Sequence, residues 1–430
     1  MQSVSIQRQV VVSACFGTFL EWYDFLSFAS LAVVIGQLFY PADDPVAGLL
    51  ASLATFGVGM LVRPLGAAFF GSMGDRVGRR KTFLATIILM GVSTVLIGVL
   101  PTYAQVGLVA PVALVILRLL QGLAVGGEIG GAAVYLSEHA PPRHRGLYTS
   151  VLQLMGPLGI MVSSLQVVAL QSWLSPEEFL AWGWRIPFLF SAILLVISLK
   201  SRLNLHESPV FQSLREHQAL LASPLKSCWQ NPAIRYRMLL LFSCVSAGGS
   251  LLFFSSQVYT GIFLKTVLGL DVAQAGILLS LATLILMPLT LLAGALSDRV
   301  GRRPVLLAGL LLGAVGLLPA FHGMARWADT PWILMMLLLV LVLALACITG
   351  PQTATLAELF PAKARYSAVA LPHNLAAGWI GGLSPWMVTW LGVKFENPFA
   401  GLWYLTLLLT LTFLIGWRYL PETRQVDMHD

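Results

Sequence analysis

Continuous apolar runs of about 20 residues or more, separated by short polar segments, follow one another along the whole chain. A run of this length crosses the hydrocarbon core of a bilayer as an α-helix, whereas a transmembrane β-strand alternates apolar and polar side chains. The pattern therefore predicts an all-α polytopic membrane protein. We expect twelve transmembrane helices, at about residues 11–39, 48–73, 83–101, 107–138, 147–172, 186–204, 237–266, 273–296, 304–322, 332–359, 366–394 and 399–420.

Charge is scarce along the chain and unevenly distributed. Only 10% of the 430 residues are charged, against roughly 25% in a soluble domain. About 20 of the 26 Lys and Arg fall on the loops that share a side with the termini, and only Arg185, Lys265, Arg326 and Lys394 fall on the opposite loops. The positive-inside rule therefore puts both termini in the cytoplasm. The net charge of +7 reflects this topology rather than a nucleic-acid partner.

A short basic turn occurs twice in the chain. The segment Gly71-Ser-Met-Gly-Asp-Arg-Val-Gly-Arg-Arg-Lys81 returns nearly unchanged as Gly294-Ala-Leu-Ser-Asp-Arg-Val-Gly-Arg-Arg-Pro304. Its aspartates, Asp75 and Asp298, are 223 residues apart, which is about half the chain. A repeat at this spacing predicts two homologous halves. The expected domains are a six-helix bundle at 1–204, a cytoplasmic central loop at 205–236 with a short helix around 209–222, and a second six-helix bundle at 237–430.

The repeated turns are candidates for a cytoplasmic gate. Opposite charges follow the helix ends in both halves, so they can pair when that side is closed and separate when it opens. The alternative is that these residues only flank helix ends and fix the orientation of the chain. The candidate gate residues are Asp75, Arg79, Arg80, Glu138 and Arg145 in the first half, and Asp298, Arg302, Arg303, Glu358 and Arg365 in the second.

The repeated turn, the six-plus-six layout and the long central loop resemble the major facilitator superfamily over the whole chain. Within that superfamily, five segments resemble the metabolite:proton symporters. The resemblance implies two pseudo-symmetric six-helix bundles, alternating access and proton-coupled transport. The segments are Glu21-Trp-Tyr-Asp-Phe25, Arg63-Pro-Leu-Gly66, Arg118-Leu-Leu-Gln-Gly122 with Gly126-Gly-Glu128, Gly183-Trp-Arg-Ile-Pro-Phe188, and Asn374 with Gly381-Gly-Leu-Ser-Pro385.

Two carboxylates, Glu21 and Asp24, lie near the middle of the first predicted span and three residues apart, which puts them on one helix face. An ionisable group inside the membrane is expensive and is a functional hypothesis by default. Held between burial and a nearby cation, such a group can take up and release a proton. Asp24 is the leading proton-coupling candidate, with Glu21 and Glu128 behind it. The alternative for Asp24 is a permanent ion pair with Arg63 or Arg118.

Arg118 lies about eleven residues into the fourth span, with Gln121 on the same helix face. Its guanidinium is a planar fork of donors that matches a carboxylate. It can bind an anionic substrate, or it can neutralise Asp24 or Glu128. Arg63, beside Pro64, is closer to a helix end, which favours a structural or gating role. Further candidates for the substrate cavity are Tyr23, Gln153, Gln257, Tyr259, His373 and Asn374.

His373 is a departure from the symporter pattern, which more often has a tyrosine before this asparagine. Imidazole changes charge near neutral pH, so His373 could mark a different substrate. A hydrogen-bonded packing histidine is the alternative. The glycines around Glu128 are interpreted as close-packing positions between helices.

No enzyme motif is present: the chain lacks a zinc-protease signature and a phosphate-binding loop. Its four cysteines have no metal-ligand spacing, so we expect no disulfide, metal or cofactor. An ion gradient is then the energy source, with protons favoured and sodium left open. The expected partners are a small-molecule substrate and membrane lipids, for a monomer that does not bind nucleic acid.

The predicted function is proton symport of a small organic acid, such as a di- or tricarboxylate, by alternating access. The first alternative is a symporter of a zwitterionic osmolyte such as proline or betaine. Osmosensing relatives carry a long coiled-coil tail, whereas this sequence stops about ten residues past the last predicted helix, which favours the organic acid. Efflux is a second alternative, supported weakly by Gly156-Pro-Leu-Gly159. A non-transporting receptor would need neither two intact gates nor buried titratable groups.

Overall fold

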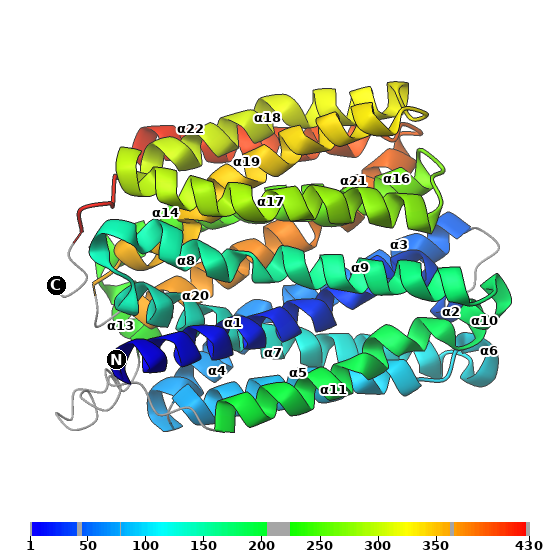
Figure 1. The fold of residues 1–430 in the computed structure, drawn as a ribbon, viewed down its shortest axis with the longest axis horizontal. Helices are drawn as coiled ribbons and strands as arrows, with labels where there is room; N and C mark the ends of the chain where they lie inside the picture. The colour runs from blue at the N-terminus through cyan, green and yellow to red at the C-terminus, as the bar shows by residue number, and fades with distance from the viewer. Residues whose placement is uncertain (1, 41–44, 78, 204–223, 362–364, 427–430) are drawn as a thin grey trace.

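The computed structural model describes residues 2–40, 45–77, 79–203, 224–361 and 365–426, and the secondary structure of these residues is entirely helical. The long helices run roughly parallel, and α1 begins at the same end of the bundle at which α22 ends (Figure 1). Among the described residues, nine helices are long and apolar enough to cross a membrane, or ten if one bent pair counts as a span. The remaining expected spans are present as shorter or interrupted helices. The chain is therefore a multi-pass membrane protein.

The helices of the first half follow the predicted spans closely. They are α1 (Gln2–Ser30), α2 (Ala32–Phe39), α3 (Pro45–Leu61), α4 (Arg63–Val77), α5 (Arg79–Val99), α7 (Val109–His139), α8 (Arg145–Gln153), α9 (Met155–Trp173) and α11 (Ile186–Leu203), with the short α6 (Tyr103–Val106) and α10 (Pro176–Ala181) on connections.

The second half repeats this arrangement with more interruptions. Its elements are α13 (Pro224–Gln230), α14 (Pro232–Leu240), η3 (Leu241–Ser246), α15 (Ala247–Phe253), η4 (Phe254–Tyr259), α16 (Thr260–Thr266), α17 (Val272–Val300), α18 (Arg302–Arg326), α19 (Pro331–Glu358), α20 (Arg365–Leu375), η5 (Ala376–Gly382), α21 (Ser384–Lys394) and α22 (Ala400–Tyr419). The short helix expected around 209–222 lies outside the described residues.

Five of the predicted spans are not continuous α-helices. The first bends by 61° between α1 and α2. The second breaks at Val62, two residues before Pro64, and the fifth breaks at Leu154, three residues before Pro157; proline cannot donate a backbone hydrogen bond. The spans at 237–266 and 366–394 contain the π-helical turns η3, η4 and η5. Such turns widen a helix locally and are frequent at functional sites.

Glycines of α7 bring it into close contact with both α3 and α4. A Cβ atom on Gly122 would lie 1.7 Å from the carbonyl oxygen of Gly59, and one on Gly126 would lie 2.0 Å from that of Arg63. Such distances are impossible for any larger residue. The packing interpretation of these two glycines is therefore confirmed, and the close approach carries the Arg63 backbone directly onto α7.

Arg185 gives the Gly183–Phe188 segment a structural role. Its Nη1 donates to the carbonyl oxygens of Gly98, at 3.0 Å, and Leu100, at 2.5 Å, just where α5 ends. The last carbonyls of a helix have no partner within the helix, and a cation there also meets the negative end of the helix dipole. The guanidinium packs over the Trp184 ring, 4.4 Å from its centroid. This contact holds the start of α11 against the end of α5.

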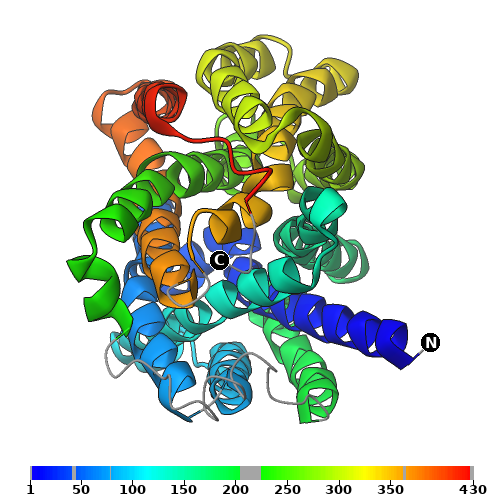
Figure 2. The same cartoon turned by 90° about the vertical axis from the view of Figure 1, so that its left-hand side faces the viewer.

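The two halves meet along two pairs of surfaces. The α8 and α9 helices lie beside α17, while α3 and α4 lie beside η5 and α20, as the view onto the end that carries the termini shows (Figure 2). The two halves therefore pack against each other along a central interface. Residues on these surfaces are the ones that alternating access would expose in turn.

Candidate functional site

Asp24, on α1, is a fully buried carboxylate. Its exposed fraction is 0%, and neither carboxylate oxygen accepts a hydrogen bond in the described part of the structure. The hydroxyl groups of Thr94 on α5 and Ser191 on α11 lie next to it. Among the side chains that the structure describes, no Lys or Arg forms an ion pair with Asp24. The permanent ion pair with Arg63 or Arg118 is therefore absent from this conformation.

Arg118, on α7, is equally buried and sits in an aromatic cage. The guanidinium carbon lies 3.9 Å from the ring centroid of Phe25, 4.5 Å from that of Phe28 and 5.1 Å from that of Phe56. These ring faces attract a cation. Nη1 donates to Gln121 Oε1 at 2.7 Å. Nε and Nη2 have no partner among the described residues, so two edges of the fork remain open.

A line of hydrogen bonds leads from the arginine towards the carboxylate. Gln121 accepts from Arg118 and donates through Nε2 to the Thr94 hydroxyl at 2.8 Å. Thr94 in turn lies beside Asp24. We call Asp24, Thr94, Arg118, Gln121 and Ser191 the Arg118 cluster. Its two charged groups are connected through neutral side chains rather than paired directly.

A second polar cluster lies on the interface between the halves. Arg63 Nε donates to Asn374 Oδ1 at 3.2 Å, across 311 positions of sequence. Arg63 is fully buried, its guanidinium carbon lies 5.6 Å from the Trp22 ring centroid, and its Nη2 has no partner in the described part of the chain. The charge of Glu21 acts on Arg63, and that of Arg63 acts on His373. We call Glu21, Arg63, His373 and Asn374 the Arg63 cluster.

Helix α1 thus serves both clusters. Glu21 neighbours Arg63 at the interface, whereas Asp24 points into the first bundle towards α5 and α11. Three residues advance a helix by 300°, so the two carboxylates lie about 60° apart around the axis and reach different neighbours. Trp22 lies between them in sequence, and its ring packs on Phe253 of the second half, with centroids 5.3 Å apart.

Four charged residues form a buried network where the halves meet at the end that carries the termini. Arg302 Nη1 donates to Asp298 at 2.6 Å, and its other nitrogens bond Glu358 at 3.2 Å. Arg145 of the first half bonds the same Glu358 at 3.0 Å. Asp298 also accepts the backbone N–H groups of Gly146 and Leu147. We call Arg145, Asp298, Arg302 and Glu358 the latch.

The segment after the last helix reinforces the latch. Glu422 accepts the backbone N–H groups of Arg302 at 2.8 Å and Arg303 at 3.1 Å, which caps the start of α18. Thr423 donates its hydroxyl to Glu358 at 2.7 Å. The sequence alone assigned no role to these two residues.

Comparison with known proteins decides the family. The family model described as "Sugar (and other) transporter" matches residues 10–223, and the model described as "Major Facilitator Superfamily" matches residues 251–428. The inner membrane metabolite transport protein YhjE of Escherichia coli is 36% identical over 99% of this chain and 96% of its own length. The chain belongs to the major facilitator superfamily.

Other transporters are similar to this chain in sequence or structure over most of its length. The citrate-proton symporter of Klebsiella pneumoniae is 36% identical over 86% of this chain and 82% of its own. The proline/betaine transporter of Salmonella typhimurium is 33% identical over 95% of this chain and 82% of its own. A structure of the E. coli xylose transporter XylE, titled as a partially occluded inward-open conformation, superposes with a TM-score of 0.78 at 20% identity, covering 98% of this chain and 100% of that one. The predicted superfamily and fold are confirmed, and the family is one of transporters rather than enzymes.

The remaining cavity candidates of this superfamily member are spread along the interface and the bundle cores. Gln153 donates to Thr353 of the other half at 2.8 Å, and His373 pairs with Ser246 at 3.0 Å. Gln257 accepts from Thr283 at 2.8 Å. In contrast, the Tyr23 hydroxyl bonds Gln166 and Pro187 inside the first bundle, and Tyr259 packs on Phe321 inside the second. These two tyrosines are not brought together with the Arg63 cluster.

Some gate candidates lie outside the latch, and the side chains of other gate and coupling candidates are not described. Arg303 donates to the carbonyl of Trp417, and Arg365 donates to the carbonyls of Ala357 and Phe360, all within the second half. The side chains of Asp75, Arg79, Arg80, Glu128 and Glu138 lie outside the described part of the structure.

Sequence reasoning underestimated several residues. Arg63 is the first residue of α4, beside the break in the second span, and its side chain reaches Asn374 of the other half. An intramembrane charge is a functional hypothesis by default, and this rule would have found it. No sequence feature predicts a role for Thr94, Ser191 or the phenylalanine cage, because a single hydroxyl or aromatic ring is common in an apolar span.

Proposed function

We propose that this protein is a proton-coupled symporter of a small organic acid. The Arg118 cluster carries the proton, and the Arg63 cluster, at the interface, receives the substrate carboxylate. The observation that carries the proposal is that Asp24 and Arg118 are both fully buried and form no ion pair with any side chain that the structure describes.

Two uncompensated charges in an apolar bundle are costly for a purely structural role. A buried charge without a partner costs several kcal/mol or more, and folded proteins normally pair or neutralise it. Asp24 can be neutralised by a proton. Arg118 cannot, so it depends on the aromatic cage and Gln121 until an anion approaches. Such a pair responds to both protons and anions, which is what a symporter requires.

The substrate carboxylate is proposed to bind first at Arg63. Its Nη2 has no partner in the described part of the chain, and it lies between Trp22 and Asn374 on the surface where the halves meet. A guanidinium fork holds a carboxylate by two parallel hydrogen bonds. Arg118 lies one layer deeper, behind Phe56, whose ring contacts Phe254 of the other half at 6.1 Å. Movement of Phe56 on opening would join the two sites and admit the carboxylate to Arg118.

Coupling follows from the same geometry. A proton on Asp24 removes the negative charge that would otherwise compete for Arg118, which frees the guanidinium for substrate. Loss of the proton restores that competition and favours substrate release. The reorientation between these events is the rocking of the two halves about the interface that the latch closes at one end.

Uptake into proteoliposomes tests the proposal. Labelled citrate, shikimate, proline and glycine betaine are offered under an imposed inward proton gradient, an inward sodium gradient, or neither. The expected result is concentrative uptake of a carboxylic acid that needs the proton gradient and collapses with a protonophore. Uptake driven only by sodium, or only in the outward direction, would contradict it.

A zwitterionic osmolyte is the second candidate. The aromatic pair of Trp22 and Phe253 beside Arg63 favours it, because ring faces recognise quaternary ammonium groups and an adjacent guanidinium suits the carboxylate. The proline/betaine transporter of Salmonella is 33% identical to this chain over 418 residues. Accumulation of proline or betaine without citrate or shikimate would select this candidate.

The orientation and assembly belong to the same proposal. The protein is proposed to act as a monomer in the bacterial inner membrane, with a first bundle at 1–204, a central loop at 205–236 and a second bundle at 237–430. Both termini and the latch lie on the cytoplasmic side, which the distribution of Lys and Arg supports. Accessibility of engineered cysteines to an impermeant reagent in intact cells tests the orientation.

A further inference from the structure

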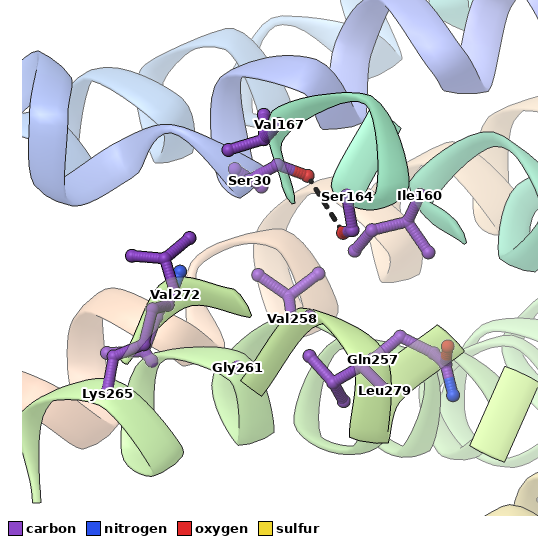
Figure 3. Close-up of a pocket in the computed structure, with 13 residues that line it drawn as sticks. Ser30, Ile160, Ser164, Val167, Gln257, Val258, Gly261, Lys265, Val272 and Leu279 are labelled. Carbon is purple, nitrogen blue, oxygen red and sulfur yellow. Dashed lines mark hydrogen bonds between the residues drawn. The ribbon is translucent and has the colours of Figure 1, made fainter. Parts of the chain in front are cut away.

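A small cavity lies between the two halves at the end of the molecule opposite the termini. It is bounded by α1 and α9 of the first half and by α16 and α17 of the second, and Lys265 and Val272 lie at its edge (Figure 3). Its volume is about 30 Å³, which leaves room for a water molecule or two. In alternating access, the halves separate along a surface of this kind when that end opens.

The polar groups around this cavity are hydrogen-bond donors. Ser30 and Ser164 lie on one wall with their hydroxyl oxygens 3.3 Å apart, and Lys265 and Gln257 lie on the other (Figure 3). The Gln257 carbonyl oxygen is already occupied by Thr283, while its Nε2 has no partner among the described residues. The residues lining the cavity include no carboxylate. A lining with an ammonium and two hydroxyls that can donate suits an anion.

Lys265 is the central observation. In the part of the chain that the structure describes, its ammonium forms no ion pair and no hydrogen bond. A lysine stem can extend along apolar surface to reach water, which would be a purely structural explanation. However, Lys265 lines the cavity between the halves together with residues of α1 and α9. An uncompensated cation at the mouth of a transport path attracts anions.

We infer that Lys265, with Ser30, Ser164 and Gln257, forms a carboxylate-capture site at the outer mouth of the transport path. The carboxylate binds there when the outer end opens and then moves inward to Arg63. Gln257 lies two turns further along the same span and supplies an intermediate N–H donor. The inference takes its substrate class and its orientation from the proposed function, but the site itself needs only a carboxylate group, which organic acids and betaines share.

Neutralising Lys265 tests the site. Lys265→Gln is expected to raise the KM for uptake of the transported carboxylate about tenfold, the effect of losing about 1.4 kcal/mol of binding, with kcat unchanged. Lys265→Arg should restore most of the loss, because it keeps the charge. The matched control is Lys394→Gln, which removes a lysine at the same end that packs over Trp390 instead of lining the cavity. Equal KM values for Lys265→Gln and Lys394→Gln would overturn the inference.

A second measurement does not depend on transport. An impermeant amine-reactive reagent is applied to the outside of oriented vesicles, and labelling of Lys265 and Lys394 is quantified by peptide mass spectrometry. Citrate and glycine betaine are expected to slow labelling of Lys265 several-fold and to leave Lys394 unchanged. Equal labelling with and without these probes would count against the site.

The two measurements separate the inference from the proposed function. Carboxylate uptake with no effect of Lys265→Gln and no protection would leave the proposed function standing and remove the capture site. Protection of Lys265 without proton-driven carboxylate uptake would retain the site and remove the proposed function. If neither proton-driven carboxylate uptake nor an effect at Lys265 were found, both the proposed function and the capture site would be contradicted.

Discussion

The Asp298 carboxylate accepts the backbone N–H of Gly146 at 2.8 Å, although the two residues are 152 positions apart and belong to different halves. The Leu147 N–H donates to the other carboxylate oxygen at 2.9 Å. These N–H groups belong to the first turn of α8, where a helix has no internal acceptors and its dipole favours a negative charge. A residue of one bundle therefore caps a helix of the other, and the cap exists only while this end is closed.

Replacing Asp298 should open this end. Asp298→Asn keeps the size of the side chain but loses the charge that holds the two N–H groups and Arg302. Hydrogen bonds to a charged group contribute about 1.5–3 kcal/mol, so we expect the open state to gain at least about tenfold in population. Spin labels at Arg143→Cys and Val300→Cys, both exposed positions, report the separation by pulsed electron paramagnetic resonance.

The control for Asp298 is another helix-capping aspartate. Asp271 accepts from the Gln274 N–H at 2.7 Å at the start of its own helix, so Asp271→Asn removes a cap without crossing the interface. It should leave the label distances unchanged. A distance distribution of Asp298→Asn that matches the wild type would contradict the latch. The repeat predicts the same opening for Asp75→Asn, although the Asp75 side chain lies outside the described residues.

Asp24 is expected to separate proton coupling from substrate movement. Asp24→Asn resembles a permanently protonated side chain, so gradient-driven accumulation should be lost while exchange of labelled for unlabelled substrate continues. Proteoliposome uptake and counterflow, measured side by side, check this. Asp329→Asn, at an exposed carboxylate, should retain both activities. Normal accumulation by Asp24→Asn would exclude it as the coupling residue.

The two buried arginines should be sensitive to a change that preserves charge. Lysine cannot make the two parallel hydrogen bonds of a guanidinium, so Arg63→Lys and Arg118→Lys should each weaken substrate binding about tenfold or more, the loss of one charged hydrogen bond. Isothermal titration with the transported substrate measures the Kd. Arg326→Lys, at an exposed position, should bind as the wild type does. Unchanged affinity for Arg63→Lys alone would move the first carboxylate contact to Arg118.

Much of this fold can be predicted from the sequence, because a segment that crosses a membrane as a helix must be apolar over about 20 residues. The apolar runs and the repeat at half the chain length predict the helices and their pseudo-symmetry. The structure places most helices within a few residues of those bounds, although α1 begins at Gln2 rather than near residue 11. The bend between α1 and α2 and the π-helical turns are not predicted, because an apolar run shows where a span lies but not how the backbone hydrogen bonds within it are paired.

The candidate site can be predicted from the sequence only in part. A charged residue within an apolar span is easily recognised, so Asp24 and Arg118 are found from the sequence. The gate residues are found because their turn occurs twice. Their partners are chosen by packing between distant helices, as when Asn374 meets Arg63 across the interface. Spacing along one helix cannot reveal such a contact. It also grouped Glu21 with Asp24, which the structure directs to different clusters.

The glycine contacts that set this geometry predict a strong effect for a single methyl group. A Cβ atom on Gly122 would lie 1.7 Å from the Gly59 carbonyl oxygen, so Gly122→Ala must push α3 and α7 apart. Overpacking of this kind costs about 1–3 kcal/mol, and we expect a lower thermal unfolding midpoint in detergent. The same shift would displace Arg118, which lies one turn from Gly122, so the Kd of the folded fraction should rise as well. Gly392→Ala is the control, because the nearest atoms to its added methyl group lie 3.5 Å away. Wild-type stability of Gly122→Ala would mean that these helices are free to separate, and that the position of Arg118 does not depend on their close approach.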